Sequence, residues 1–317
     1  MVLSSDEIEK RINDSYEVAN NVINAVPQPM VSVRTSTYQH ASYITQCIES
    51  ILMQKTNFSF EYIIGEDFST DGTREIVFEY AKKYPDIIRV ITADYNVGMK
   101  SNGMRCQRAY RGKYIALCEG DDYWTDPLKL QKQVDFLEQN TDYCLCFHNA
   151  HYRYECRNSK IFPFNKDLHK HVFNTLDVIS MEWFVPPQSI VYRKDLYQIP
   201  EWVSFVQQGD IAMLLLLSLS GNLYYIDEIM SVYRKHKTGM GKTVNFSVTI
   251  NKYIELLCYF DMHSGFKYHS EIEKRKLMLR KKLYKAYFYN RKKIVQFLSF
   301  DFYAFKLDAL FKKMSNR

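Results

Sequence analysis

Five strand-like and four helix-like segments alternate between about residues 30 and 150, and this alternation constrains the fold more than any other feature. The strand-like segments VSVRTSTY, FEYIIGEDF, IIRVITA, KYIALC and YCLCFHNA are rich in β-branched and aromatic residues. Between them, ASYITQCIESILMQ, REIVFEYAKKY, SNGMRCQRAYRG and PLKLQKQVDFLEQN carry apolar residues at helical spacing. This order is typical of βαβ units, so we predict an α/β fold with a mostly parallel sheet flanked by helices.

Helical patterns flank this core on both sides. SSDEIEKRINDSYEVANNVINAV predicts an amphipathic helix, with Ser4 and Glu7 spaced as a capping box. After residue 245 the apolar spacing is again helical. We therefore divide the chain into an N-terminal helix at 1–28, an α/β domain at 29–240 and a basic helical C-terminal region at 241–317.

The net charge of +6 is unevenly distributed. Residues 271–317 contain 14 Lys and Arg against 4 Asp and Glu, a balance of +10, whereas the rest of the chain has a balance of −4. A solvated helix face, contact with an anionic membrane and contact with nucleic acid are three interpretations of such a tail.

The sequence also indicates a compartment. No run of about 18 apolar residues predicts a membrane-spanning helix, and the first residues lack the pattern of a signal peptide. The seven cysteines are odd in number and contain no CxxC pair, which favours unpaired thiols in a reducing environment. These features predict a cytoplasmic protein.

Polar residues gather where the predicted strands end. They are Thr35 to Tyr38 after the first strand, Glu66 and Asp67 after the second, and Asp121 and Asp122 after the fourth. In open parallel sheets, ligands bind beyond the carboxyl ends of the strands. Two adjacent carboxylates repel each other unless a cation offsets them, so the last pair indicates either a polar turn or a Mn²⁺ or Mg²⁺ site.

Motifs that cradle phosphate groups with backbone amides are absent from the sequence. It contains neither GxGxxG after the first strand nor GxxxxGK[ST]. A phosphate-containing ligand would therefore depend on a metal ion for charge neutralisation.

Four stretches, in this order, resemble family 2 glycosyltransferases, which are inverting enzymes with the GT-A fold. They are VSVRTSTYQHASYITQCIESILMQ, EYIIGEDFSTDGTREIV, NVGMKSNGMRCQRAYRGKYIALCEGDDYWTDP and KLQKQVDFLE. PPQSIVYRK and QGDIAMLLLLSLSGNLYYIDEIMSVYRKH extend the resemblance to about residue 237. It implies that residues 29–240 are a GT-A domain that binds a nucleotide sugar and carries out catalysis.

The resemblance also implies roles for single residues on the donor side. The nucleotide base would contact Thr35, Tyr38 and Asp67. Asn96 and Gly98 match the family's NxG motif after the third strand. Asn102 and Arg105 would face the diphosphate.

For the metal and the chemistry, the resemblance implies five further residues. Asp122 would bind the metal, and Asp121 would contact the ribose or a metal-bound water. His236 would complete the metal site, and Arg234 would pair with the diphosphate. Asp210 would be the general base, although its place before an apolar helix equally fits an N-cap.

The function implied is inverting transfer of a sugar from a nucleoside diphosphate donor, expected to be a UDP-sugar, to a hydroxyl of a glycan or lipid-linked acceptor at the inner face of the membrane. A metal-dependent nucleotidyltransferase is one alternative, but RTSTYQHAS lacks the expected glycines. A non-catalytic nucleic-acid-binding module is the other, but the acidic body would repel phosphate chains, so we expect no nucleic acid. An oligomer is compatible with the sequence; the sugar, the acceptor and the linkage stay open.

Overall fold

The computed structural model describes residues 4–155, 160–236 and 246–289. The chain forms two compact units, one spanning 1–243 and the other 244–317. The predicted boundary near residue 240 lies close to this division.

A parallel sheet forms the centre of the first unit. Its strands are β2 (Val31–Thr37), β3 (Phe60–Glu66), β4 (Ile88–Thr92) and β5 (Tyr114–Leu117). They lie in the order β4-β3-β2-β5, and each neighbouring pair is parallel. The predicted α/β fold with a mostly parallel sheet flanked by helices is confirmed.

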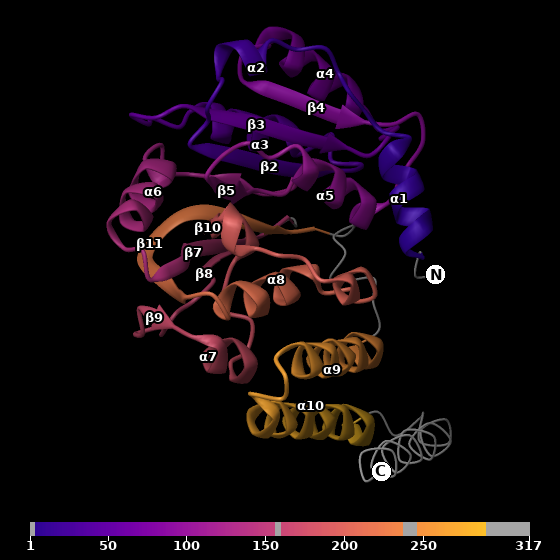
Figure 1. Ribbon diagram of the computed structural model, residues 1–317, viewed down its shortest axis with the longest axis vertical. Helices are drawn as coiled ribbons and strands as arrows, with labels where there is room; N and C mark the ends of the chain where they lie inside the picture. Colours follow the sequence, from indigo (N-terminus) through magenta and orange to yellow (C-terminus); the bar gives the residue numbers. More distant parts are fainter. Residues whose placement is uncertain (1–3, 156–159, 237–245, 290–317) are drawn as a thin grey trace. The chain divides into compact units, whose positions relative to one another are not determined.

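Helices cover both faces of this sheet, as Figure 1 shows. They are α3 (Ile44–Leu52), α4 (Thr73–Lys83), α5 (Met99–Arg108) and α6 (Lys129–Gln139). On one face, Ile48 of α3 and Val77 of α4 share a buried cluster with Val33 of β2. On the other face, Cys106 of α5 packs against Ile63 of β3. Strand residues thus pack against helices on both faces, which explains why the strands are buried almost along their whole length.

The second half of this unit extends the same sheet. Its strands are β6 (Tyr123–Trp124), β7 (Tyr143–Tyr154), β8 (Ile161–Pro163), β9 (Val172–Phe173), β10 (Val191–Arg193) and β11 (Asn222–Lys235). β10 lies antiparallel between β5 and β7, and β11 runs parallel to β7 along most of its length. The short β6, directly after the acidic pair, is antiparallel to β11. This pairing brings the acidic pair to the carboxyl end of β11.

Further helices of this half are short. They are α7 (Thr175–Ser180), α8 (Gly209–Ser218) and the 3₁₀ turns Pro187–Ser189, Lys194–Leu196 and Glu201–Ser204. Thr175 of α7 donates its hydroxyl to the carbonyl of Ser218, which ties α7 to the end of α8.

The N-terminal segment corrects one prediction. The capping box is present, since the side chains of Ser4 and Glu7 each accept the other residue's backbone amide. The helix α1 (Ser5–Asn13), however, ends well before residue 28 and is followed by β1 (Tyr16–Glu17) and α2 (Val22–Ala25). β1 pairs with β4, and Glu17 forms an ion pair with Arg89 at 2.7 Å. Pairing with the sheet edge therefore overrides the helical propensity of this segment.

The second unit contains α9 (Phe246–His263) and α10 (His269–Tyr289), which contact each other. The predicted helical C-terminal region is thus present as far as residue 289, and residues 290–317 lie outside the described part. Among the helices that the structure describes, none is long and apolar enough to cross a bilayer.

Lys129, the first residue of α6, is a lysine inside the core of the first unit. Its side chain is fully buried, and its Nζ lies 4.0 Å from the centroid of the Trp124 ring. Among the described residues, Nζ has no hydrogen-bond partner. Burial lowers the pKa of this ammonium group from 10.5 to about 7, so the folded protein favours the neutral amine.

We expect Lys129→Met to increase the free energy of unfolding at pH 6. The unfolded chain holds the lysine proton up to pH 10.5 and the folded chain only up to about pH 7, so wild-type stability gains from this residue as pH rises between these values. The difference in the free energy of unfolding between the variant and the wild type should therefore shrink by about 2 kcal/mol between pH 6 and about pH 8.5. Urea denaturation of the variant and of the wild type at both pH values measures this difference. Lys132→Met, which removes an ion-paired surface lysine one turn later, should give no such gain. A destabilised Lys129→Met protein, or an advantage that does not vary with pH, would contradict the prediction.

Candidate active site

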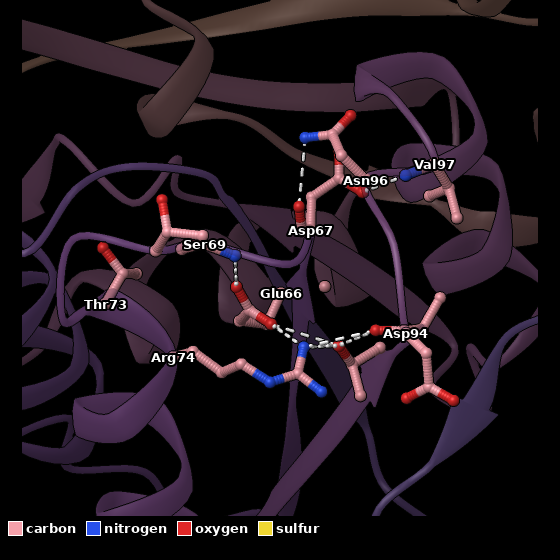
Figure 2. Close-up of polar contacts among 12 residues, drawn as sticks. Glu66, Asp67, Ser69, Thr73, Arg74, Asp94, Asn96 and Val97 are labelled. Atoms are coloured by element: carbon pink, nitrogen blue, oxygen red, sulfur yellow. Dashed lines mark hydrogen bonds and ion pairs between the residues drawn. The ribbon is translucent and has the colours of Figure 1, made fainter.

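The carboxyl end of β3 is the first part of the candidate site, and Figure 2 shows its contacts. Asp67 is 2% exposed, and its two carboxylate oxygens accept the backbone amides of Val97 at 2.8 Å and Gly98 at 3.1 Å. Asn96 donates its side-chain amide to the carbonyl of Asp67 at 3.1 Å. Asp67 therefore fixes the turn after β4, and its contact with a nucleotide base stays a prediction.

This arrangement shapes both the turn and the charge of Asp67. Burial raises the pKa of the Asp67 carboxyl above its ordinary value, and the two backbone amides and Arg105 partly oppose that shift. Gly98 is the N-cap residue of α5 and has a φ of 88°, a backbone conformation that residues with a Cβ atom rarely adopt. The NxG motif thus has a local cause, because its Asn and Gly build the turn that Asp67 holds.

Asn102 and Arg105 on α5 were predicted to face a diphosphate, and in this structure both form hydrogen bonds within the protein. Asn102 is 2% exposed and donates to the carbonyl of Gly65 at 2.8 Å. Arg105 is 3% exposed and donates to the carbonyl of Glu66 at 2.7 Å and to the side chain of Asn102 at 2.9 Å. Both side chains bind α5 to the end of β3, so neither is available to a ligand in this conformation.

The end of β2 contains one buried and one open candidate. The hydroxyl of Thr35 is fully buried and lies 2.9 Å from the hydroxyl of Tyr62, and its contact with a base stays a prediction. Tyr38, by contrast, is 45% exposed just beyond the strand. Of the two, only Tyr38 presents a surface on which a base could stack.

Asp122 was predicted to bind the metal, but it lies below the surface of the acidic turn. It is 1% exposed, and its Oδ1 accepts the backbone amide of Arg234 at 2.7 Å. Burial, followed by the charge of neighbouring Asp121, raises the pKa of the Asp122 carboxyl well above its ordinary value. Asp122 thus joins the acidic turn to β11, and its role as a metal ligand stays a prediction.

Arg234 belongs to the same structural connection. Its guanidinium donates to the carbonyl of Asp121 at 2.7 Å, contacts the side chain of Gln46 and lies 3.3 Å from the carboxylate of Glu155. It also stacks over the ring of Tyr123 at 4.4 Å. With these partners and 5% exposure, Arg234 stabilises the acidic turn, and its pairing with a diphosphate stays a prediction.

Asp121, His236 and His40 form the group best suited to a metal ion. Their candidate ligand atoms all lie within 4.8 Å of one another, and Oδ2 of Asp121 lies 2.9 Å from Nε2 of His236. Burial opposes ionisation of Asp121, but the hydrogen bond from His236 and the proximity of His40 outweigh it and lower the pKa of Asp121. An imidazole–carboxylate set of this kind fits a divalent transition metal.

Sequence reasoning missed His40, which follows β2 by three residues. Nothing in the sequence marks this histidine, apart from its place beside a polar strand end. Gly120 explains its position: a Cβ atom at Gly120 would lie 2.9 Å from Nδ1 of His40 and 2.6 Å from Oγ1 of Thr37. The glycine before the two aspartates is therefore needed for the acidic turn to approach His40.

Asp210 lies in the first turn of α8 rather than at its N-cap. Gln208 is the N-cap residue and makes no side-chain cap, which corrects the N-cap interpretation. Oδ1 of Asp210 accepts the backbone amide of Ile211 at 2.8 Å, while the residue is open to solvent. The surrounding protein nevertheless raises the pKa of Asp210 above its ordinary value through desolvation, and Glu119 adds to the shift. The carboxylate is therefore accessible and moderately basic.

Glu119 and Tyr233 connect Asp210 with the acidic turn. Glu119 forms an ion pair with Arg34 of β2. Tyr233 of β11 has a pKa raised by burial and, in addition, by the charges of Asp122, Asp121 and Asp210. The carboxylates of the acidic turn and the carboxylate of Asp210 therefore all raise the pKa of the same phenol. The sequence analysis had no signal for Tyr233.

Comparisons with known proteins agree with this architecture. The family model described as "Glycosyl transferase family 2" matches residues 32–214. An uncharacterised protein of Mycobacterium bovis is 35% identical over 66% of this chain and 60% of its own length. The putative teichuronic acid biosynthesis glycosyltransferase TuaG of Bacillus subtilis is 26% identical over 71% of this chain and 84% of its own length.

Solved structures with a similar fold include residues 1–349 of S. aureus TarS in complex with UDP-GlcNAc. That structure has a TM-score of 0.55 and 17% identity, and the match covers 72% of this chain and 65% of the other. The mannosyltransferase PcManGT from Pyrobaculum calidifontis, in complex with GDP-Man and Mn²⁺, has a TM-score of 0.52 and 14% identity over 88% of this chain and 80% of its own. The chain spans about 60% of the length of the mycobacterial relative that it matches.

Proposed function

The chain belongs to glycosyl transferase family 2, and from this premise we propose that it transfers a sugar from a nucleoside diphosphate to a hydroxyl of a glycan or lipid-linked acceptor, with inversion. The observation that carries the proposal is the group of Asp121, His40 and His236, whose candidate ligand atoms lie within 4.8 Å of one another beyond the strand ends; Asp210, on α8, is exposed to solvent. The nucleotidyltransferase and nucleic-acid-binding alternatives find no support in the family match.

The donor in this proposal is a UDP-sugar. The support is indirect: TarS, which has a similar fold, was solved with UDP-GlcNAc, whereas PcManGT was solved with GDP-Man. In this chain, exposed Tyr38 would stack on the base. Asp67 would act through the turn at Asn96 to Gly98, which it holds at the strand ends, rather than by touching the base.

A divalent metal would be held by Asp121, His40 and His236. A carboxylate oxygen and two imidazole nitrogens suit Mn²⁺ or another first-row transition metal better than Mg²⁺, which prefers oxygen ligands. When bound, the metal would offset the negative charge of the donor diphosphate. Asp122 and Arg234 would keep Asp121 in place, because they tie the acidic turn to β11.

Asp210 would act as the general base. In a single displacement, the acceptor oxygen forms the new bond to the anomeric carbon while the bond to the diphosphate breaks. The acceptor hydroxyl gives its proton to the Asp210 carboxylate, and the nucleoside diphosphate leaves with the bonding electrons. A position in the first turn of a helix suits this role, since the positive end of the helix dipole favours the ionised form.

The experiment that tests the proposed function is a thermal-shift screen with UDP-, GDP-, dTDP- and CMP-sugars, with and without Mn²⁺. We expect UDP-sugars with Mn²⁺ to raise the midpoint of unfolding, because a ligand that binds only the folded state stabilises it by about 2.7 kcal/mol at 100 times its Kd. If no nucleotide sugar raises the midpoint with or without Mn²⁺, the proposed function is wrong.

The basic C-terminal region supports a further part of the proposal, peripheral binding to an anionic membrane at its cytoplasmic side. Each basic residue near such a surface contributes about 1 kcal/mol, and residues 271–317 have a balance of +10. Full-length protein should co-sediment with anionic vesicles at low salt, and protein lacking 271–317 should not. Equal sedimentation of the two proteins would show that the region serves another purpose.

A further inference from the structure

An open hollow of about 480 Å³ lies in the first unit, outside the groups described so far. Its lining includes the aromatic side chains of Tyr152, Phe162, Phe164 and Trp183, and we call it the aromatic hollow. Its volume is within the range of roughly 300–1,000 Å³ typical of small-ligand sites. The hollow is built by the end of β7, the strand β8 and the segment after it, and the segment that follows α7.

The chemistry of the lining is that of a site for a sugar ring. Aromatic rings offer flat apolar surfaces on which the C–H face of a pyranose can lie. Lys166 and Asp167 add charged, hydrogen-bonding side chains to the same lining, whereas the side-chain amide of Asn165 already donates to the carbonyl of Phe184 at 2.8 Å. Phe162 is 39% exposed even though it is aromatic, which leaves apolar area open to a ligand.

The aromatic hollow is connected to the reaction centre through Tyr233. Tyr152 of β7 and Tyr233 of β11 occupy paired positions on adjacent parallel strands, and their rings meet edge to face at 5.4 Å. Phe164 stacks on Tyr152 at 4.5 Å and approaches Tyr233 at 6.2 Å. The charges of Asp121, Asp122 and Asp210 all influence the Tyr233 phenol. Tyr233 directly precedes Arg234, whose backbone amide donates to the Asp122 carboxylate at 2.7 Å, so the hollow borders the part of β11 that holds the acidic turn.

The hollow lies on the side of β11 opposite to the metal-binding group. Arg234 and His236 lie toward α3, where their side chains meet Tyr43. Tyr233 and Lys235 face the other way, and Nζ of Lys235 lies 4.2 Å from the centroid of the Tyr152 ring. A displacement with inversion needs separate places for the acceptor and for the leaving diphosphate, and the residues that line the hollow are separate from the metal-binding group.

We propose that the aromatic hollow is the acceptor subsite, in which a sugar ring of the glycan acceptor lies against Trp183. This inference rests on the proposed function, because it supplies the second substrate of that reaction. The acceptor hydroxyl next to the bound ring would then extend past Tyr233 toward Asp210.

Indole NMR of the full chain tests the proposal without activity. The sequence holds three tryptophans, Trp124, Trp183 and Trp202, so ¹⁵N-labelled indoles give three signals that Trp183→Phe and Trp202→Phe assign. The probes are methyl glycosides of glucose, galactose, mannose, N-acetylglucosamine and rhamnose. We expect at least one to shift the Trp183 signal saturably at millimolar concentration while the buried Trp124 signal stays in place. No movement of the Trp183 signal with any glycoside up to about 100 mM would overturn the proposal.

Kinetics provides the second readout. Trp183→Ala should raise the KM of a glycan acceptor about tenfold, the equivalent of one lost stacking contact, and Trp183→Phe should restore most of it. Hydrolysis of the donor without acceptor, and UDP binding with Mn²⁺, should not change. Tyr16→Ala, which removes an exposed aromatic from the far edge of the sheet, is the control.

The outcomes separate the two proposals. An unchanged acceptor KM in Trp183→Ala, or an equal loss of donor hydrolysis, would overturn the acceptor subsite and leave the donor site standing. Absence of UDP binding in the wild-type protein would instead overturn the proposed function, whatever the glycosides do to Trp183.

Discussion

Asp210→Asn is expected to lower the rate of sugar transfer by a factor on the order of 10²–10⁴, the usual loss when a general base is removed. The amide keeps the size of the carboxylate and can still accept the backbone amide of Ile211, so α8 should begin where it does in the wild type. Donor binding, measured by thermal shift with UDP-sugar and Mn²⁺, should be unaffected. The loss should therefore fall on kcat and leave the Kd of the donor in place.

A pH profile separates a base from a structural residue. Asp210 works only when ionised, so transfer should increase as pH rises through its pKa, which desolvation sets above the ordinary value of an aspartate. Asp195→Asn is the matched control, because Asp195 is also an exposed aspartate in the first turn of a short helix. Near-normal turnover of Asp210→Asn would mean that another group accepts the proton.

Asp121→Asn is expected to weaken Mn²⁺ binding at least about 100-fold. Loss of a residue that merely orients a ligand already costs 10–100-fold in metal affinity, and Asp121 supplies the carboxylate of the proposed group. Electron paramagnetic resonance of free Mn²⁺ measures this directly, without donor or acceptor. His40→Gln and His236→Gln should each weaken binding as well.

Asp122→Asn is the control that makes this experiment decisive. The two aspartates are adjacent, but the side chain of Asp122 is buried and accepts the amide of Arg234, a bond that an asparagine oxygen can also make. Mn²⁺ affinity should therefore stay within a few-fold of wild type. If Asp122→Asn loses Mn²⁺ and Asp121→Asn keeps it, the assignment of the metal to Asp122, as the sequence predicted, is right and the present one is wrong.

The central sheet could be predicted because its strands are buried on both faces. Segments such as β3 and β4 are buried almost along their whole length and rich in Ile, Val and aromatic residues, and the helices between them show clear periodicity, so local pattern and final structure agree. Prediction failed at Tyr16 and Glu17, where helical propensity extends through the segment. Only the pairing with Thr92 and Ile91 of β4 makes these residues a strand, and that partner lies more than 70 residues away.

The candidate site was less predictable for a physical reason. Sequence position placed the polar residues correctly at the strand ends but could not determine the direction of each side chain. Asp121 and Asp122 are chemically identical, and the long-range bond from Arg234 decides which one is buried. Arg105 is likewise a basic residue on an amphipathic helix, and its inward direction depends on the carbonyl of Glu66.

The alternation of side chains along β11 has a consequence for engineering. His236 and Arg234 serve the metal side, whereas Tyr233 and Lys235 border the aromatic hollow, so a single strand carries two sets of residues that can be varied separately. A library confined to the odd-numbered positions 233 and 235, together with Trp183, would explore new acceptors against a constant donor. The backbone of β11 would stay unchanged while the residues facing the metal-binding group and those facing the aromatic hollow are varied independently.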